Sequence, residues 1–521
     1  MVKAARGVGA LSIQSAANSL LGFLFFMLFA RMVSRTEMGV YATVTLIFTI
    51  LAFTGTLGLD FAAARFIPHF KGKNEQDKAS FAAKRILLVT LASAIIFCLS
   101  QLLASDFLST WLLGAIEYAG FFRIAAFITA SMILSTVFLA FLQGLQRFGE
   151  MALFRLVSQV LRLGVSIGLL IAGLGVAAAL VGWIVFYGAI ALLAFLSYLK
   201  FLSSKSFQVP VNDNCFPYKL MFRFSLPMMV YQLVNFFSGS VDSFIVLGFL
   251  GAAALGVYTV AVTASLGIIL TLVMPLLFTL TPGMSEIHAK EGVERTSQAL
   301  KISSRYISIL FVPLCFGFAV LSPLIINIMA GVKYWDAALP LSIMCAGLAT
   351  YGFSTAITST LIALGKTVKV ASSFLLASIV GLASTIFFVP FFGVVGAAFG
   401  RNVIYFSTLA FLILAGQKVI RFSWDVEALW KCCLSSMFAS FVVLVFAYNT
   451  GYNLFLLPFY LLVMFIVYGL TLGSFKTLDR EDLSLMLRIV PWGEKFNSIL
   501  NWIAVRSPRV MKILNWLFKD S

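Results

Sequence analysis

The chain has 521 residues, of which 61% are hydrophobic and 11% are charged, and its formal net charge at pH 7 is +17. Soluble domains carry about a quarter charged residues, so this composition excludes a soluble globular protein. A helix needs about 20 apolar residues to cross a bilayer, and apolar runs of that length recur between short polar breaks. Because strand-type alternation is absent, the sequence predicts an all-α polytopic integral membrane protein.

In chain order, the apolar runs predict fourteen transmembrane helices. The first run is too long for the core of a signal peptide and meets Arg31 rather than a small-residue cleavage site, so it is interpreted as a retained span. The fourteen predicted helices cover residues 7–30, 39–60, 86–104, 118–142, 157–174, 176–199, 225–249, 253–281, 306–330, 339–364, 370–390, 394–416, 432–449 and 454–474.

The distribution of Lys and Arg sets the predicted orientation. An even number of helices places both termini on one side, and Lys and Arg concentrate on cytoplasmic flanks. Of the 37 Lys and Arg residues, only five fall towards the far face: Arg31, Arg35, Arg123, Lys333 and Arg401. The sequence therefore predicts a multi-pass protein of the cytoplasmic membrane with both termini in the cytoplasm.

The connections on the two faces are expected to differ. The inner loops at residues 65–85 and 282–305 are long and basic, whereas the outer connections near Gly173–Gly175, Gly251 and Gly393 are predicted to be tight turns. No separate outer domain is expected.

An internal repeat divides the chain into two copies of one unit. Asn18 precedes Gly39-Val40-Tyr41 by twenty-one residues, and Asn235 precedes Gly256-Val257-Tyr258 by the same interval, at an offset of 217. Two further glycine pairs agree with this register within one residue, at an offset of 218: Gly175 with Gly393, and Gly182 with Gly400. Six helices per copy is an even number, so we expect parallel repeats related by an axis along the membrane normal.

The repeat and the polar breaks predict the domain organisation. Pro227 lies in the first turn of the second copy, where a missing N–H costs least. The tail mixes aromatic and basic residues, which fits either helices in the inner membrane interface or a helix packed on inner loops. The predicted parts are an N-lobe at 1–199, a cytoplasmic linker at 200–224, a C-lobe at 225–416, two extra helices at 417–474 and the tail at 475–521.

Metal, disulfide and nucleotide sites are not predicted. The six cysteines lie mostly in apolar segments, where a thiol behaves as a small hydrophobe, and they form no CxxC pair. Gly365-Lys366-Thr367 is similar to the end of a phosphate-binding loop, but Thr360 stands where that loop has its first glycine. The sequence therefore predicts no cofactor, and the position of its positive charge between alternate spans argues against nucleic acid.

Polar residues within the predicted helices are the first functional candidates, because such residues are rare in membranes and usually face a bundle interior or a wet cavity. Gln14 and Asn18 share one helix face, and Gln232, Asn235 and Asp242 share another. Asp242 is the candidate for coupling to Na+ or H+. Hydrogen bonding between packed helices is the other role that suits these groups, and the sequence leaves it open.

Four strings resemble the Wzx-type oligosaccharide flippases of the multidrug/oligosaccharidyl-lipid/polysaccharide (MOP) transporter superfamily: GLDFAAARFIPHF (58–70), RFSLP (223–227), VDSFIVLGFLGAAALGVYTVA (241–261) and IFFVPFFGVVGAAFG (386–400). The resemblance implies two six-helix lobes around a central cavity and alternating access. It further implies that polyprenyl phosphate- or pyrophosphate-linked oligosaccharide moves to the outer leaflet for cell-surface polysaccharide assembly. Membrane lipids and the glycan polymerase and glycosyltransferase machinery are the partners expected from it.

A phosphate-linked lipid requires fixed cations in the cavity, because a desolvated phosphate must be paired and Arg can pair with it bidentately. Arg162 and Arg401 lie inside predicted helices and are the leading candidates, with Arg65 and Arg123 as further ones. Arg155, Arg223 and Arg305 on the inner half and Arg31 on the outer half complete the set, although inner arginines ordinarily mark the level of lipid headgroups. Asp60 is expected to form an ion pair, with Arg65 or with a cation of the other lobe.

Several alternative functions remain. A peptidoglycan-precursor flippase also has fourteen spans and an arginine-rich cavity, whereas a cation-coupled multidrug exporter would have twelve spans and more cavity carboxylates. A membrane glycan polymerase or ligase would need catalytic groups on an outer loop, but both histidines and nearly all long loops are expected inside. A transporter, and not an enzyme, is therefore predicted.

Overall fold

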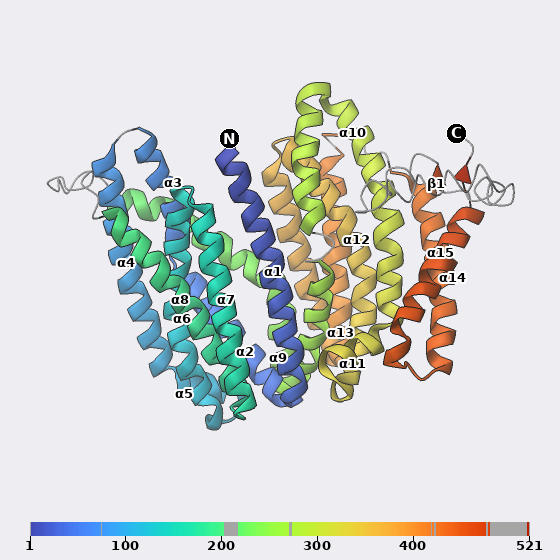
Figure 1. Ribbon diagram of the computed structural model, residues 1–521, viewed down its shortest axis with the longest axis horizontal. Coiled ribbons are helices and arrows are strands. Elements are labelled where there is room, and N and C mark those ends of the chain that lie inside the picture. Colours follow the sequence, from blue (N-terminus) through green and yellow to red (C-terminus); the bar gives the residue numbers. More distant parts are fainter. Residues whose placement is uncertain are drawn as a thin grey trace. The chain divides into compact units, whose positions relative to one another are not determined.

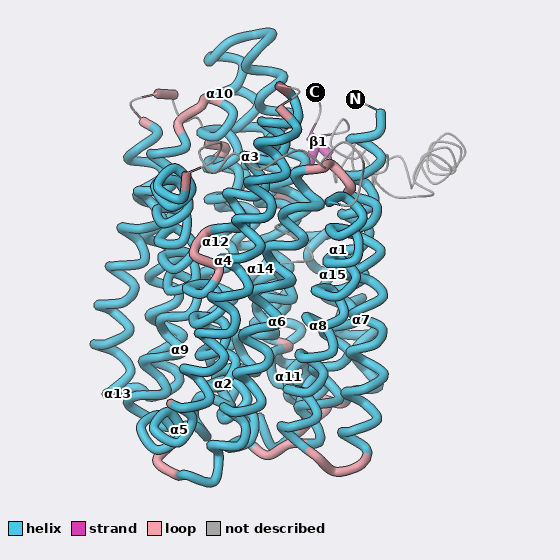
Figure 2. The backbone as a smooth tube through the Cα atoms, turned by 90° about the vertical axis from the view of Figure 1, so that its left-hand side faces the viewer, coloured by secondary structure: helices cyan, strands magenta, loops and turns pink. Residues whose placement is uncertain are grey.

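The computed structural model describes residues 2–73, 75–202, 217–269, 274–417, 419–420, 424–475, 478–479 and 518–519. Within these ranges the chain is helical almost throughout, with one two-residue parallel strand pair, β1 (Leu478–Asp479) and β2 (Phe518–Lys519) (Figure 1). Loops are short connections between helices (Figure 2). The prediction of an all-α protein is confirmed. Most of the predicted linker and tail lies outside the described residues.

The structure assigns fifteen α-helices and three short 3₁₀ helices to the described residues. The α-helices are α1 (Val2–Met32), α2 (Arg35–Gly55), α3 (Leu59–Gly72), α4 (Gln76–Leu103), α5 (Ser105–Leu113), α6 (Ala119–Gly144), α7 (Phe148–Ile171), α8 (Gly175–Leu202), α9 (Tyr218–Ile268), α10 (Met274–Val320), α11 (Ser322–Ala330), α12 (Ala338–Ala363), α13 (Thr367–Gly416), α14 (Val426–Asn449) and α15 (Leu457–Ser474). The 3₁₀ helices are η1 (Ile116–Tyr118), η4 (Val332–Ala337) and η5 (Leu454–Leu456).

Two of the longest helices are hairpins that turn at a glycine. Gly251 in α9 has φ 81° and Gly393 in α13 has φ 59°, conformations that glycine adopts without strain. The Tyr258 hydroxyl lies 2.5 Å from the Asp242 carboxylate, sixteen residues away. A straight helix would separate these residues by about 24 Å, so the two arms of α9 must lie side by side.

The described helices account for the predicted number of spans. Eleven of them are long and apolar enough to cross a membrane, by length and composition. The turns at Gly251 and Gly393 divide two of these into two arms each, and α1 adds its apolar part Ala17–Met32. The described chain therefore provides the fourteen segments that the sequence predicts, and the chain is a multi-pass membrane protein.

The two long inner connections are helical rather than the loops predicted from the sequence. Residues 65–85 are shared between α3 and α4, and α10 continues through 282–305 with a turn at Gly292. Figure 1 shows the two arms of α10 side by side in yellow-green. Within the first arm, Lys290 pairs with Glu286, four residues earlier, at 2.5 Å and supports the helix. Arg295 pairs with Glu291 at 3.0 Å across the turn at Gly292. Charge alone therefore marks the end of the apolar run but not the end of the helix.

One predicted span is shorter than expected. The span predicted at 306–330 ends at Val320, and a separate helix, α11, begins at Ser322. Pro323 follows directly, and proline is favoured in the first turn of a helix because its missing N–H has no partner there.

The chain forms two compact units. Unit 1 comprises Met1–Thr263, Met329–Asp336 and Thr385–Ala397, and unit 2 comprises the remaining segments. Unit 1 has an apolar core made by α3, α4, α6 and α8, whereas in unit 2 a core joins α10, α11, α14 and α15. The boundaries of the predicted lobes stay a prediction.

Repeat-related glycines meet inside unit 1. A Cβ atom added at Gly39 of α2 would lie 1.7 Å from the carbonyl oxygen of Ala252. A Cβ atom at Gly256 of α9 would lie 2.0 Å from the carbonyl oxygen of Arg35 and 3.0 Å from the amide nitrogen of Gly39. These two glycines therefore permit α2 and α9 to pack closely.

Candidate functional site

A polar cavity of about 630 Å³ lies within unit 1. This volume is in the range of about 300–1,000 Å³ that is usual for small-molecule sites. Five helices contribute side chains to it: α1, α3, α6, α7 and α8. The lining residues are Gln14, Ser15, Asn18, Ser19, Asp60, Phe61, Met132, Ser135, Thr136, Leu139, Ala140, Gln143, Met151, Arg155, Phe186, Tyr187 and Ile190.

Helix α1 supplies the amide side of the cavity. Gln14 and Asn18 are four residues apart and therefore lie on one helix face, next to the hydroxyls of Ser15 and Ser19. Gln14 is 5% exposed, and neither its Oε1 nor the Oδ1 of Asn18 has a hydrogen-bond partner. Buried polar atoms are normally paired, so these amides have hydrogen-bonding capacity left for a ligand or water.

Helix α7 supplies the cation of the cavity. Arg155 is half-buried, and no acidic side chain in the described part of the chain forms an ion pair with it. A guanidinium group held in a membrane without a carboxylate partner is available to an anion, which it can bind through two N–H groups at once. The aromatic side chains of Phe186 and Tyr187 line the cavity from α8.

Asp60 carries the negative charge of the cavity, and its partner is not the predicted one. Its Oδ2 accepts a hydrogen bond of 2.6 Å from Nε2 of Gln232 on α9, and within the described residues it forms no ion pair. The guanidinium of Arg65, the predicted partner, instead lies 4.4 Å from the ring centre of Phe224. The expectation of an ion pair with Arg65 is therefore wrong, because the side chain of Arg65 packs on an aromatic face while Asp60 faces α9. Pairing with a cation of the other lobe stays a prediction.

Arg162 lies behind the wall of the cavity rather than among the lining residues. It is 6% exposed, and its guanidinium is 3.5 Å from the ring centre of Trp183 and 5.4 Å from that of Phe25. Trp183 stacks on Tyr187, with ring centres 5.4 Å apart. Arg162 thus contacts a ring that supports the cavity wall. A role of Arg162 in contact with substrate stays a prediction.

Asp242 is buried and well bonded. It is 1% exposed, accepts the bond from the Tyr258 hydroxyl on Oδ2, and accepts a bond of 2.9 Å from the backbone N–H of Ser243 on Oδ1. It does not belong to the lining of the described cavity. Its bonds hold the arms of α9 together, and the predicted part in ion coupling stays a prediction.

The other predicted site residues lie apart from this cavity. Gln232 is linked to it through Asp60, whereas Asn235 is exposed. Arg123 is exposed and pairs with Asp106 at 2.8 Å. Arg401 is 6% exposed and lies in unit 2. Of the predicted lining residues, the structure therefore brings Gln14, Asn18 and Arg155 together in the cavity.

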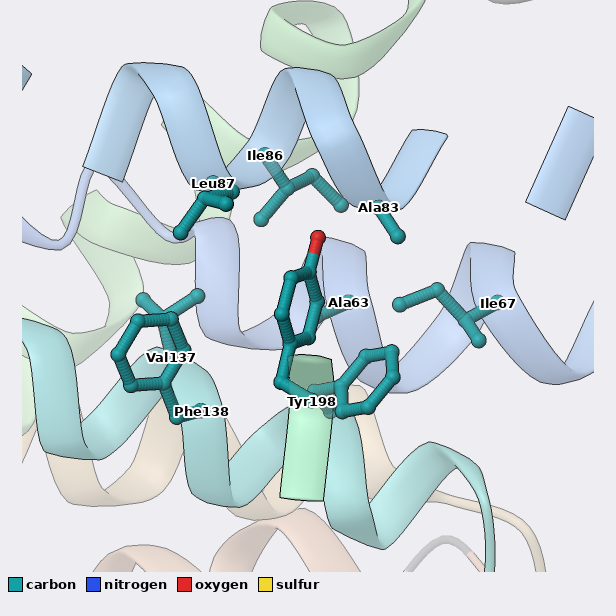
Figure 3. Close-up of a pocket in the computed structure, with 9 residues that line it drawn as sticks. Ala63, Ile67, Ala83, Ile86, Leu87, Val137, Phe138 and Tyr198 are labelled. Atoms are coloured by element: carbon teal, nitrogen blue, oxygen red, sulfur yellow. The ribbon is translucent and has the colours of Figure 1, made fainter. Parts of the chain in front are cut away.

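A second, much smaller cavity is no binding site. It has about 10 Å³ of free space, close to the minimum for one water molecule. The hydroxyl of Tyr198 points towards apolar side chains of α4, among them Ile86 (Figure 3), and has no hydrogen-bond partner. The Tyr198 hydroxyl is the one polar side-chain group among its lining residues, and the free space is too small for an organic ligand.

A family model described as "Polysaccharide biosynthesis protein" matches residues 28–339. The chain belongs to this family. It is also 26% identical over 345 residues to the succinoglycan biosynthesis transport protein ExoT of Rhizobium meliloti (strain 1021), a match that covers 64% of this chain and 64% of that relative. The family relationship and the membrane-spanning helices make the chain a polysaccharide biosynthesis protein of the membrane.

Solved structures share the fold of this polysaccharide biosynthesis protein. The lipid II flippase MurJ in an inward closed conformation has a TM-score of 0.67 at 17% identity, and covers 88% of this chain and 97% of its own. A multidrug resistance MATE family transporter of the MOP superfamily, in an inward-facing conformation, has a TM-score of 0.63 at 16% identity, with 81% and 99% covered. The fold is therefore that of MOP superfamily transporters.

The sequence named Arg155 among the inner-half arginine candidates of this polysaccharide biosynthesis protein but did not favour it, because its place in the lining depends on tertiary packing. Gln143 is a lining residue that the sequence did not name. Gln143 lies just past the end of a predicted span, in FLQG, and a polar residue at that position is a signal that could have found it.

Proposed function

We propose that this polysaccharide biosynthesis protein is a flippase for oligosaccharide linked to polyprenyl phosphate or pyrophosphate. It moves this lipid from the inner to the outer leaflet of the cytoplasmic membrane by alternating access, and it performs no covalent chemistry. The observation that carries the proposal is the polar cavity among membrane helices, with Arg155 unpaired in its wall. The cargo class is supported by the family and by a relative that is named a transport protein of succinoglycan biosynthesis.

Each part of the cavity suits one part of such a lipid. Arg155 pairs with a phosphate oxygen, because a charged donor in a poorly solvated site binds an anion strongly. The amides of Gln14, Asn18 and Gln143 donate to and accept from sugar hydroxyls. The ring of Tyr187 offers an apolar face to the C–H face of a sugar. The polyprenyl tail needs no site in this cavity, because it stays in the lipid.

The orientation belongs to the same proposal. Both termini are cytoplasmic, so the polar arms of α10 lie on the cytoplasmic side, where the lipid-linked substrate is made. An oligosaccharide carried on pyrophosphate gains about 2.3 kcal/mol for each negative charge and each 100 mV when it leaves a negative interior. The membrane potential therefore favours export.

The decisive experiment is flipping by purified protein in vesicles that contain a fluorescent polyprenyl-pyrophosphate oligosaccharide. Wild-type protein should expose the sugar to a periodate or lectin probe faster than protein-free vesicles. Arg155→Ala should slow flipping about tenfold or more, because a hydrogen bond to a charged group contributes about 1.5–3 kcal/mol, and about 1.4 kcal/mol is a factor of ten.

Arg123→Ala is the matched control, since Arg123 is also an arginine of unit 1 but lies in an exposed ion pair outside the cavity. It should flip the lipid at the wild-type rate. Equal rates for wild type, Arg155→Ala and Arg123→Ala would remove Arg155 from the transport path. Three other results would replace the proposal. Flipping of lipid II alone would indicate a peptidoglycan-precursor flippase, and export of cationic drugs alone would indicate a multidrug exporter. Lengthening of the glycan chain would indicate a polymerase.

A further inference from the structure

Asp60 and Asp242 both lie within membrane-spanning helices of unit 1, and their hydrogen bonds differ. Both oxygens of Asp242 accept a bond, from the Tyr258 hydroxyl and from the N–H of Ser243. Asp60 accepts one side-chain bond on Oδ2, from Gln232, while its Oδ1 is buried and has no hydrogen-bond partner among the residues that the structure describes. Burying a carboxylate oxygen that has no hydrogen-bond donor costs free energy, and binding of a proton to the carboxylate removes that cost.

The charged groups around Asp60 do not neutralise it. Arg155 of α7 and Tyr187 of α8 line the same cavity, but neither bonds to the carboxylate. On its own helix, the guanidinium of Arg65 lies over Phe224, and Arg85 of the neighbouring α4 lies over Phe81 at 4.4 Å. Helices α1 and α6 present neutral amides and hydroxyls to the cavity, and α9 presents Gln232. No cation of the described chain is within ion-pair distance of Asp60.

The geometry around Asp60 favours a proton over a metal cation. A metal ion needs several oxygen ligands at once, whereas a proton needs only the unpaired Oδ1. Gln232 presents its Nε2–H to Asp60, and its Oε1 lies 3.4 Å from the hydroxyl of Thr56, so its oxygen is directed elsewhere.

Asp60 also lies at a tight contact between two helices. Gly58, two residues earlier, has φ 67°, and a Cβ atom there would lie 2.0 Å from the carbonyl oxygen of Ser225 and 2.9 Å from the amide nitrogen of Met229. The N-terminal end of α3 therefore abuts the backbone of α9, the helix that carries Gln232.

We propose that Asp60 is the proton-binding residue of the transport cycle, and that the proton it takes on Oδ1 weakens the contact between α3 and α9. The ionised carboxylate holds Gln232 by a charge-assisted hydrogen bond, and such bonds are roughly twice as strong as neutral ones. A proton from water neutralises the carboxylate and leaves an ordinary bond. This inference rests on the proposed function, because it names the group that links that transport to a proton gradient.

The first test needs no transport. Infrared difference spectra of the purified full-length protein in detergent, recorded across a pH series, report protonation of carboxyl groups. A carboxyl band that titrates should be present in wild type and in Asp242→Asn, and lost in Asp60→Asn. Gln232→Leu removes the donor and should move the titration of the band to higher pH. A band lost in Asp242→Asn but kept in Asp60→Asn would overturn the assignment.

The second test uses the vesicle flipping assay with an imposed pH gradient or an imposed Na+ gradient. Wild type should change its flipping rate several-fold with the pH gradient and not with Na+, and Asp60→Asn should be insensitive to both. Asp60→Glu keeps the carboxyl group and should keep the pH response, which guards against a variant that fails to fold. A response to Na+ alone, or a pH response unchanged in Asp60→Asn, would overturn the inference.

The two proposals fail separately. If the protein flips the lipid-linked oligosaccharide but Asp60 does not titrate, the proton site is wrong and the flippase proposal stands. If Asp60 titrates in the spectra but no lipid-linked oligosaccharide is flipped, the proposed function is wrong and the proton site stands.

Discussion

Tyr198 and Tyr258 each bury a hydroxyl group, but in opposite circumstances. Tyr198 is 3% exposed and its hydroxyl faces apolar side chains without a partner (Figure 3), whereas Tyr258 is fully buried and its hydroxyl donates to Asp242. Leaving a buried polar group unpaired costs about 1–3 kcal/mol, which is more than a formed hydrogen bond contributes. The same change of residue therefore has opposite consequences at the two sites.

Tyr198→Phe should raise the free energy of unfolding by about 1 kcal/mol, because it removes an unpaired hydroxyl. Tyr258→Phe should lower it by about 1–3 kcal/mol, because Asp242 loses a donor in a buried site. Thermal unfolding of the full chain in one detergent measures both. Shifts of the same sign in the two variants would contradict this account of the hydroxyls.

Arg155 and Arg162 show what a sequence can and cannot say about a single residue. They are seven residues apart, so they lie on nearly the same face of α7, and both have the charge that a phosphate requires. From the sequence, Arg162 was the favoured cavity candidate because it lies deeper within the apolar run. The structure places Arg155 among the residues that line the cavity and Arg162 over the ring of Trp183. Only tertiary contacts distinguish the two.

At the level of elements, glycines decide how closely helices approach. Gly39 and Gly256 let the backbones of α2 and α9 touch, whereas Gly248 on α9 has no atom within 4 Å of the place where a Cβ would stand. The repeat in the sequence marks the first two but cannot show that they meet each other. That contact is a property of the folded unit.

Gly39→Ala and Gly256→Ala should each lower the free energy of unfolding by about 2 kcal/mol or more, because the added Cβ atom would overlap a backbone carbonyl. Gly248→Ala is the matched control, because Gly248 lies on α9, the same helix as Gly256. It should be neutral or stabilising by up to about 1 kcal/mol, since alanine favours the helix and nothing obstructs its methyl group. Thermal unfolding of the three variants checks this, and equal losses in all three would show that the close backbone contact does not determine the cost at Gly39 and Gly256.

The helices themselves were largely predictable, and the exceptions have a physical cause. Long apolar runs give the spans, and glycines give the turns at Gly251 and Gly393. The segment 282–305 was predicted as a loop because it is charged, yet Lys290 and Glu286, four residues apart, form an ion pair that supports its first helical arm, and Arg295 and Glu291 pair across the turn at Gly292. The cavity could not be read in the same way, because its residues come from five helices that are distant in the chain.

At the level of the whole molecule, the distribution of Lys and Arg predicts the orientation in the membrane. The predicted outer face holds only five of these residues, and the inner face holds the rest. Positive residues resist translocation and stay on the cytoplasmic side. The direction of transport that we propose depends on this orientation.

Epitope tags at the N-terminus and at the C-terminus should both be protected from added antibody in intact spheroplasts and become accessible after permeabilisation. A tag inserted at Gly114 is the opposite control, because it lies in the turn between α5 and η1 and has no neighbour within 4 Å of its Cβ position. This tag should bind antibody without permeabilisation. Labelling of either terminus in intact spheroplasts would reverse or break the predicted topology.

The glycine turns of α9 and α13 also have a consequence for biogenesis. At Gly251 and Gly393 the chain reverses direction with hardly any polar residue between two apolar arms. Such a pair presents nothing hydrophilic that a translocon must pass across the bilayer before the second arm arrives. The two arms therefore suit insertion together, as one unit that leaves the ribosome already paired. A polar residue in place of either glycine would therefore lower the efficiency of membrane insertion before it lowered the stability of the folded protein.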